Sequence, residues 1–230
     1  MRLIRLAALA LSLASVAMLS VAATRAVPGN WNAQVAVTPS GSHVLGNPAA
    51  QLKLSEYISY TCPHCAHFDA EASDRLRIYG IAQGKLSVEV RHLVRDPIDL
   101  TVAMLTNCGP PARFFANHTA FLRSQTQWMA LANRATQAQQ ARWTNGTQKS
   151  RLQSIATDFG FFAMMAQRGY DHMTVERCLA DPGMAQKLAA QTSEATQLGV
   201  EGTPSFLLNG ALLAGTHDWA SLKAQLDARM

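Results

Sequence analysis

Apolar and polar residues alternate with a period of two in short stretches at both ends of the chain. This pattern is typical of β-strands, whose successive side chains point to opposite faces of a sheet. It predicts strands at residues 43–45, 51–60, 86–90, 205–208 and 211–214. An Asn-Gly pair separates the last two strands, and this pair strongly favours a tight hairpin turn.

Helical patterns occupy most of the remaining chain. A helix is predicted from Cys62 to about Gln83, because Pro63 suits a first helical turn and Gly84 can end the helix. Helices follow one another over residues 96–199, starting at an Asp-Pro pair that resembles a cap and first turn. Residues 217–230 form a closing amphipathic helix.

This order of elements predicts an α/β fold with an inserted all-helical subdomain. Residues 43–96 and 200–230 are predicted to form the α/β domain, and residues 97–199 the helical insertion. Residues 27–42, with two Pro and two Gly, are expected to be a loose lead-in. Composition is continuous along the chain, which favours one domain with an insertion over two linked domains.

The N-terminus has the pattern of a secretory signal peptide at residues 1–26. Arg2 and Arg5 precede an apolar segment at residues 6–19, and small residues up to Ala26 offer cleavage sites. The alternative is an uncleaved membrane anchor. No cysteine follows the apolar segment directly, so a lipoprotein anchor is not indicated.

Charge and composition narrow the function classes. The formal net charge of +5 would fall to +2 after cleavage, so the basic balance is not evidence for a nucleic-acid partner. Hydrophobic residues make up 48% of the chain and charged residues 15%, which predicts a packed core. An even number of cysteines in an exported protein fits disulfide chemistry. They are Cys62, Cys65, Cys108 and Cys178.

The Cys-Pro-His-Cys stretch at residues 62–65 has four interpretations. A zinc site needs a second ligand pair, which the widely separated Cys108 and Cys178 do not supply. Covalent haem attachment needs histidine at position 66, where the chain has alanine. A structural staple closing so short a loop would remove little chain entropy. A redox-active pair therefore remains as the favoured interpretation.

The spacing of the pair predicts different roles for its two sulfurs. Cys62 at a helix N-terminus meets unpaired N–H groups and the positive end of the helix dipole, which favour a thiolate. It is expected to be the exposed, low-pKa nucleophile, with Cys65 one turn later as the buried resolving thiol. His64 is expected to stabilise the thiolate further. A stabilised thiolate makes the disulfide more oxidising, so donation of disulfides to other proteins is predicted.

Together with Gly-Thr-Pro-Ser-Phe at residues 202–206, the Cys-Pro-His-Cys motif resembles the DsbA family of periplasmic thiol oxidases. The resemblance covers about residues 43–230. It implies a thioredoxin fold with an inserted helical domain and a thiol:disulfide oxidoreductase activity. It also implies no cofactor beyond the Cys62–Cys65 disulfide, and no metal.

The resemblance implies roles for further residues. Pro204 matches a cis-proline opposite the active-site disulfide, with Thr203 free to pair with an extended substrate. The alternative is that Pro204 only starts an edge strand. Glu56 matches a buried acid that handles the proton of Cys65, the alternative being a solvent-facing strand residue. His67 and Asp69 are expected to be ordinary surface residues.

A second, non-catalytic disulfide occurs in some DsbA-like proteins within the helical region. By this resemblance Cys108 and Cys178 are expected to pair with each other. The alternative is that either cysteine is free and buried.

The implied partners are unfolded exported proteins as substrates and a membrane quinone reductase of DsbB type for reoxidation, in the periplasm. Two other functions stay open. A disulfide isomerase or reductase is one, although residues 27–42 are too few for the N-terminal assembly domain usual in isomerases of this fold. The other is a chaperone module that binds clients in a groove while its cysteines are idle.

Overall fold

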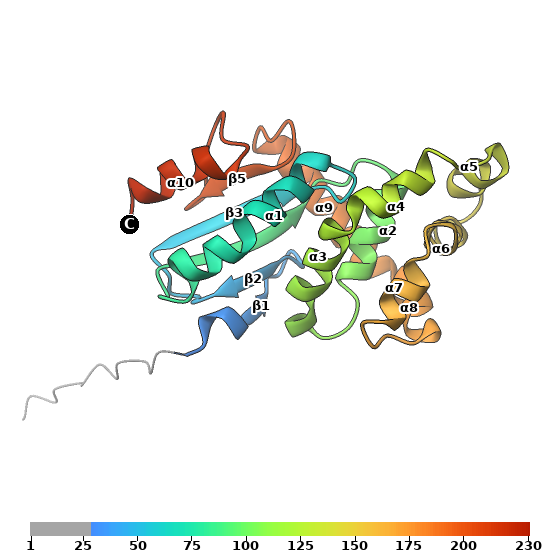
Figure 1. Cartoon of the computed structure of the whole chain (residues 1–230), viewed down its shortest axis with the longest axis horizontal. Helices are drawn as coiled ribbons and strands as arrows, with labels where there is room; N and C mark the ends of the chain where they lie inside the picture. The colour runs from blue at the N-terminus through green and yellow to red at the C-terminus, as the bar shows by residue number, and fades with distance from the viewer. Residues whose placement is uncertain (1–28) are drawn as a thin grey trace, which may run out of the picture.

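The computed structural model describes residues 29–230 and contains a six-stranded mixed sheet (Figure 1). The spatial order of the strands is β1-β2-β4-β3-β5-β6, with β3 and β4 parallel and every other neighbouring pair antiparallel. The strands are β1 Val35–Val37, β2 His43–Gly46, β3 Leu52–Ile58, β4 Leu86–His92, β5 Ser205–Leu208 and β6 Ala211–Leu212. The predicted signal peptide, residues 1–26, lies outside the described residues.

Strand β3 lies inside the sheet, between β4 and β5, and both of its faces are covered. Leu54 and Ile58 are buried on one face and Tyr57 on the other. Its last residues lead directly to Cys62, so the centre of the sheet carries the cysteine pair. At the sheet edge, Asn209 and Gly210 both have positive φ angles, which matches the predicted hairpin turn between β5 and β6.

The residues before position 43 are more ordered than predicted. They form a 3₁₀ turn at Trp31–Ala33 and then β1, which pairs with β2 in the register Val35↔Leu45. The prediction of a loose lead-in over residues 27–42 is therefore wrong for this part. A three-residue strand carries too short an alternation to detect, and its partner strand decides its conformation.

The helices occupy the segments where the sequence predicted them. The helix predicted over Cys62–Gln83 is α1 Pro63–Leu76, continued by a π-helical segment at Arg77–Ile81. The others are α2 Pro97–Thr106, α3 Phe114–Arg123, α4 Gln125–Ala132, α5 Gln137–Thr144, α6 Gln148–Asp158, α7 Phe161–Ala166, α8 His172–Leu179, α9 Pro182–Gln197 and α10 Trp219–Asp227, with a 3₁₀ turn at Pro111–Arg113. Among residues 29–230, none of these helices combines the length and apolarity needed to cross a membrane.

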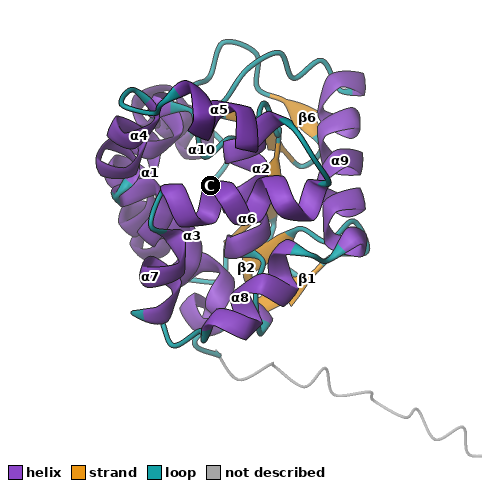
Figure 2. Cartoon of the chain, turned by 90° about the vertical axis from the view of Figure 1, so that its right-hand side faces the viewer, coloured by secondary structure: helices purple, strands orange, loops and turns teal. Residues whose placement is uncertain are grey.

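Helices cover both faces of the sheet. Helices α1 and α10 contact each other on one face, and α9 lies across the other face (Figure 2). Helix α9 is tied to the end of β4, where the Gln191 side chain accepts a hydrogen bond from the His92 N–H at 2.9 Å and Thr192 accepts one from the Val94 N–H at 3.0 Å. The sheet is thus covered on this side by a helix from the segment predicted as the insertion.

A disulfide links the loop after α2 to helix α8 within this segment. Cys108, just after α2, is bonded to Cys178 in α8, and their Cα atoms are 5.5 Å apart. The bond spans a sequence separation of 70 residues. A long closed loop of this kind restricts the unfolded chain more than the folded one.

Replacing both Cys108 and Cys178 by alanine is expected to lower the free energy of unfolding by about 4 kcal/mol, because the unfolded chain regains loop-closure entropy. Urea unfolding followed by circular dichroism measures the difference. Peptide mapping without reduction should first show the 108–178 linkage in the wild type. Equal unfolding midpoints for the two proteins, or free thiols at both positions, would contradict the expectation.

Candidate active site

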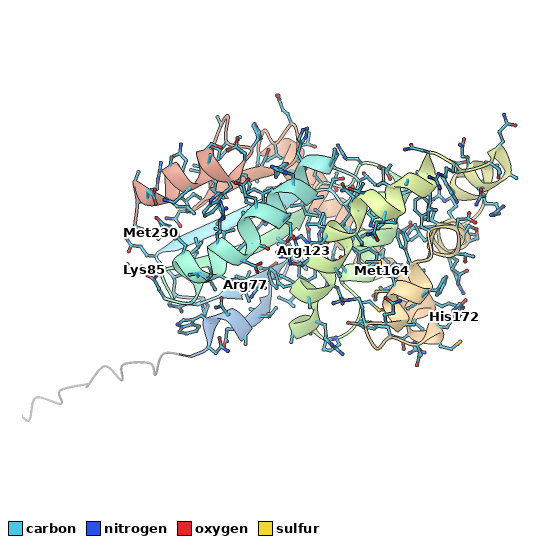
Figure 3. All side chains as sticks on the ribbon, in the orientation of Figure 1. Arg77, Lys85, Arg123, Met164, His172 and Met230 are labelled. Atoms are coloured by element: carbon cyan, nitrogen blue, oxygen red, sulfur yellow. A yellow bond between two sulfur atoms is a disulfide. The ribbon has the colours of Figure 1, made fainter. Side chains whose placement is uncertain are left out.

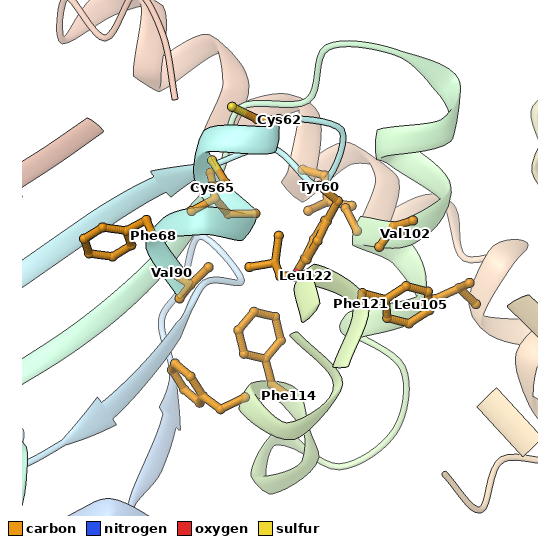
Figure 4. Packing of buried hydrophobic residues seen from close by; sticks show 14 of the residues in the cluster. Tyr60, Cys62, Cys65, Phe68, Val90, Val102, Leu105, Phe114, Phe121 and Leu122 are labelled. Atoms are coloured by element: carbon orange, nitrogen blue, oxygen red, sulfur yellow. The ribbon is translucent and has the colours of Figure 1, made fainter. Parts of the chain in front are cut away.

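The segment between β3 and α1 presents the cysteine pair. The Cys62 N–H donates to the Ser59 carbonyl at 3.2 Å, which closes a tight turn after the strand. Cys62 then occupies the N-cap of α1, with Pro63 as the first helical residue. Both sulfurs consequently lie at the first turn of α1 (Figure 4), and both cysteines are free thiols in this structure.

Hydrogen bonds favour the thiolate of Cys62. Donation from the Cys65 thiol has the largest effect, followed by the Thr203 hydroxyl and by the backbone N–H groups of Cys65 and His64. Together they lower the pKa of Cys62 to about 4, although burial acts in the opposite direction. The Thr203 hydroxyl oxygen is buried and has no hydrogen-bond partner of its own among residues 29–230, so it is free to turn toward the sulfur.

The pKa of Cys65 is shifted in the opposite direction to that of Cys62. It is completely buried, and burial raises the pKa of its thiol well above the ordinary value. The hydrogen bond to Cys62 and the charge of the Cys62 thiolate raise it further. The pair therefore combines a Cys62 thiol of low pKa with a Cys65 thiol of high pKa. This difference allows Cys62 to attack or leave as a thiolate while Cys65 holds its proton.

Cys62 is not exposed, contrary to the sequence prediction. Only 2% of the residue is accessible, because the loop containing Thr203 lies against it. The Cys62 sulfur lies 3.1 Å from the Thr203 carbonyl oxygen across this contact, and it can donate to that oxygen when the thiol is protonated. The two residues are 141 positions apart, so the local sequence around Cys62 does not indicate that Thr203 buries it.

The Thr203–Pro204 peptide bond in that loop is cis. Two neighbouring side chains hold the loop in place. Ser205 donates to the Gly202 carbonyl at 2.8 Å, and the His217 ring contacts the Pro204 carbonyl at 2.8 Å. Pro204 is buried and precedes β5, so the loop approaches the cysteine pair from the strand next to β3.

The His64 side chain is exposed on the first turn of α1 and forms no hydrogen bond within residues 29–230. Its contribution to the Cys62 thiolate in this structure comes from its backbone N–H. His64 thus interacts with the Cys62 sulfur through its backbone N–H and not through its imidazole ring.

Glu56 is buried, so the alternative of a solvent-facing strand residue is wrong. It lines a small cavity of about 40 Å³ beneath α1, together with Asp69 and His118. Burial raises the pKa of Glu56 to about 8, and the neighbouring charge of Asp69 adds to the effect. Glu56 is therefore predominantly protonated at neutral pH and can donate or accept a proton near that pH.

Asp69 was expected at the surface but is 3% exposed. It follows Cys65 by four residues, which places it on the buried side of α1. One of its oxygens accepts from Thr119 at 3.3 Å, and its carboxylate also lies 3.5 Å from Arg123 and 3.8 Å from His118. Burial raises the pKa of Asp69, and Arg123 partly opposes that effect. His67 lies on the surface, as predicted.

The cavity adjoins a surface groove between α1, α3 and the first strands. Arg77, Phe115 and Thr119 line both spaces, and Arg123, between α1 and α3 (Figure 3), lines only the groove. Helix α3 from the helical segment therefore forms one wall next to the buried acids. Within residues 29–230, no group of three or more His, Cys, Asp or Glu side chains is arranged to hold a metal ion.

Sequence reasoning missed residues of the helical segment that contact the turn before Cys62, and Asp99 and Gln125 bind its backbone. Asp99 of α2 accepts from the Tyr60 N–H at 2.7 Å and the Ser59 hydroxyl at 2.6 Å, and burial raises its pKa to about 7. Gln125 of α4 donates to the carbonyls of Tyr60 and Cys62. Asp99 is in the first turn of a predicted helix, where acids are common for local reasons, and Gln125 has no sequence signal.

The fold and the cysteine pair define a protein of the thioredoxin type. A family model described as thioredoxin matches residues 38–228. The chain therefore belongs to the thioredoxin family. This result confirms the predicted α/β class and thioredoxin fold.

Solved structures agree with this assignment. A protein-disulfide isomerase from Novosphingobium aromaticivorans is 56% identical, with a TM-score of 0.79, and the match covers 82% of this chain and 97% of that one. The Wolbachia pipientis protein alpha-DsbA1 is 21% identical, with a TM-score of 0.64 and coverage of 84% and 92%. The second match shows that the fold is DsbA-like.

Curated protein sequences also match the chain, at lower identity. A "Putative protein-disulfide oxidoreductase" of Rickettsia bellii is 27% identical over 169 residues, which is 73% of this chain and 56% of that protein. The protein with the same name in Rickettsia felis is also 27% identical, over 186 residues. The chain spans about half the length of the curated relatives it matches.

Glu56→Gln is expected to change how stability depends on pH. The folded wild type keeps the Glu56 proton up to about pH 8, whereas the unfolded chain releases it near pH 4.5. Between these values the unfolded state binds fewer protons, so this group lowers stability by about 1.4 kcal/mol per pH unit as pH rises. The variant lacks this loss and should gain stability relative to the wild type across that window.

Urea unfolding of both proteins at several pH values between 4.5 and 8 measures this difference. Other titrating groups are common to both proteins and cancel in the comparison. Stability curves that run parallel over the whole window would show that Glu56 is ionised in the folded protein.

Proposed function

We propose that this protein is a protein-disulfide oxidoreductase that donates disulfide bonds to exported proteins. The observation that carries the proposal is the opposite acidity of the two sulfurs, with the pKa of Cys62 lowered to about 4 and that of Cys65 raised. Interactions that stabilise the reduced, thiolate form make the corresponding disulfide a stronger oxidant. Electrons are therefore expected to run from client thiols to the pair.

The reaction begins with the oxidised Cys62–Cys65 disulfide. A client thiolate attacks the Cys62 sulfur, the S–S bond breaks, and Cys65 leaves with the electron pair and takes up a proton. A second client thiolate then attacks the client sulfur of the mixed disulfide, and Cys62 leaves as a stabilised thiolate. The client gains one disulfide, and the protein gains the two electrons as a dithiol.

The other predicted residues have proposed roles in these steps. Thr203 supplies its hydroxyl to the Cys62 thiolate, and its backbone lies where an extended client segment would reach the sulfur. Pro204 shapes that loop, and the His64 N–H stabilises the thiolate. Glu56, protonated near neutral pH, is proposed to supply the proton that Cys65 requires as a leaving group.

The proposed setting is the periplasm, after removal of a signal peptide at residues 1–26. Unfolded exported proteins are the proposed clients. A membrane quinone reductase of DsbB type is the proposed acceptor that returns the pair to its disulfide form. In this proposal residues 43–96 and 200–230 provide the catalytic domain, and residues 97–199 provide the helical insertion.

An isomerase or reductase is the second candidate. It is favoured by the printed name of the Novosphingobium aromaticivorans structure, a protein-disulfide isomerase 56% identical to this chain. Both functions use the same nucleophile, so they differ in the reduction potential of the pair and in the form in which a cell keeps it. A chaperone with idle cysteines would not need the hydrogen bonds that lower the pKa of Cys62.

Single substitutions separate the redox functions from a chaperone with idle cysteines. Cys62→Ser is expected to abolish both oxidation of a dithiol peptide and reduction of insulin, because no other sulfur can attack or leave as a stabilised thiolate. Cys65→Ser, mixed with a client that holds a disulfide, should accumulate a mixed disulfide seen by mass spectrometry: the Cys62 thiolate attacks one client sulfur, the other client sulfur leaves as a thiolate, and the resolving thiol that would release Cys62 is absent. Full activity in Cys62→Ser would remove the assigned nucleophile.

The direction of electron flow is tested by the reduction potential of the Cys62–Cys65 pair against glutathione. A disulfide donor should be more oxidising than protein disulfide isomerase, at about −180 mV. Such a protein should also oxidise a dithiol peptide faster than it reduces insulin. A value near that of thioredoxin, about −270 mV, would assign reduction instead.

A further inference from the structure

The Gln125 side chain joins the helical segment to the turn that presents Cys62. Gln125 is the first residue of α4 and is only 4% exposed. Its amide nitrogen donates to the Tyr60 carbonyl at 2.6 Å and to the Cys62 carbonyl at 2.8 Å. A single amide group therefore engages two carbonyls of one turn, over sequence separations of 65 and 63 residues.

Gln125 provides the shorter of two hydrogen bonds to the Cys62 carbonyl. The bond to it within α1, from the Ala66 N–H, is 3.4 Å long, beyond the usual range of about 2.7–3.2 Å. Tyr60 is fully buried, so its carbonyl is also shielded from solvent. Without Gln125, the Tyr60 carbonyl would lose the donor that Gln125 supplies, and the Cys62 carbonyl would keep only the long bond from Ala66, so the turn would be held less firmly.

The same turn is held on its other side by two acids at the start of α2, the N-cap residue Asp96 and Asp99 of the first turn. Asp99 accepts from the Tyr60 N–H at 2.7 Å, and Asp96 accepts from the Thr61 hydroxyl at 2.7 Å. Gln125 therefore completes an arrangement in which the helical segment fixes both the N–H and the C=O groups of the turn. The orientation of Cys62 is consequently set by residues outside the βαβ unit that carries it.

We propose that Gln125 is a positioning residue of the active site, and that its two hydrogen bonds hold the Cys62 sulfur against the donors at the first turn of α1. Those donors are the Cys65 thiol and the backbone N–H groups of His64 and Cys65. A small rotation of the Cys62 peptide unit would lengthen several of these bonds together. The inference rests on the proposed function of Cys62 as the nucleophile.

Gln125→Leu tests the proposal, because leucine has a similar volume and no donor. The pKa of Cys62 is read from the ultraviolet absorbance of its thiolate as a function of pH. It should rise by about one unit, and the equilibrium with glutathione should shift about tenfold toward the oxidised protein. Gln125→Ala, which carries no risk of a steric clash, should give the same shift and decides the question if the leucine variant does not fold.

Gln191→Leu is the matched control. Gln191 is also a buried glutamine in the helical segment, accepts from the His92 N–H at 2.9 Å and donates to the Ser40 carbonyl at 3.0 Å. Its loss should destabilise the protein in urea, as the loss of Gln125 should, but leave the pKa of Cys62 unchanged. The charged groups around the turn, Asp96, Asp99 and Arg95, are the same in all variants.

An unchanged Cys62 pKa in folded Gln125 variants would overturn the proposal, and so would an equal rise in Gln191→Leu. The proposed function is judged separately, from the peptide oxidation activity of the wild type. A wild type without oxidase activity, together with a pKa shift confined to the Gln125 variants, would reject the direction of electron flow while supporting the positioning role.

Discussion

The hydrogen bonds that converge on the Cys62 sulfur at the N-terminus of α1 are the interaction on which the rest of the site depends. The Cys65 thiol, the Thr203 hydroxyl and backbone N–H groups of α1 all favour a thiolate at this position. These donors come from two distant parts of the chain, and their geometry requires the sheet to bring β3 and β5 side by side. The mixed sheet thus places the Cys62 sulfur, the N-terminus of α1 and the loop containing Thr203 next to one another.

The same site carries ionisable groups that reduce the stability of the fold. Burial raises the pKa values of Glu56, Asp69 and Asp99, and it lowers those of three buried histidines. These histidines are His43, His92 and His118. Shifts of this kind mean that the folded state binds protons differently from the unfolded chain, so stability changes with pH. Such groups are often retained where a reaction needs a proton near neutral pH.

Much of the scaffold could be predicted from local patterns. The alternation in β3 and β4, the Asn-Gly turn before β6, and the Asp-Pro start of α2 all occur where the sequence indicated. The cysteine pair at the start of α1 was also evident, because proline and the helix terminus are encoded within four residues. The edge strand β1 was missed, because three residues are too few for an alternation and its pairing with β2 decides its structure.

The sequence by itself determined the candidate residues: two thiols three positions apart at a helix start and, through the family resemblance, a downstream Thr-Pro pair and an acid six positions before the first cysteine. The tertiary structure alone decided their environment. It buries Cys62 under Thr203, places Asp69 beside the Glu56 cavity, and brings Gln125 to the carbonyl of Cys62. Local sequence encodes backbone preferences over a few residues, whereas burial and hydrogen bonding depend on segments that meet only in the folded chain.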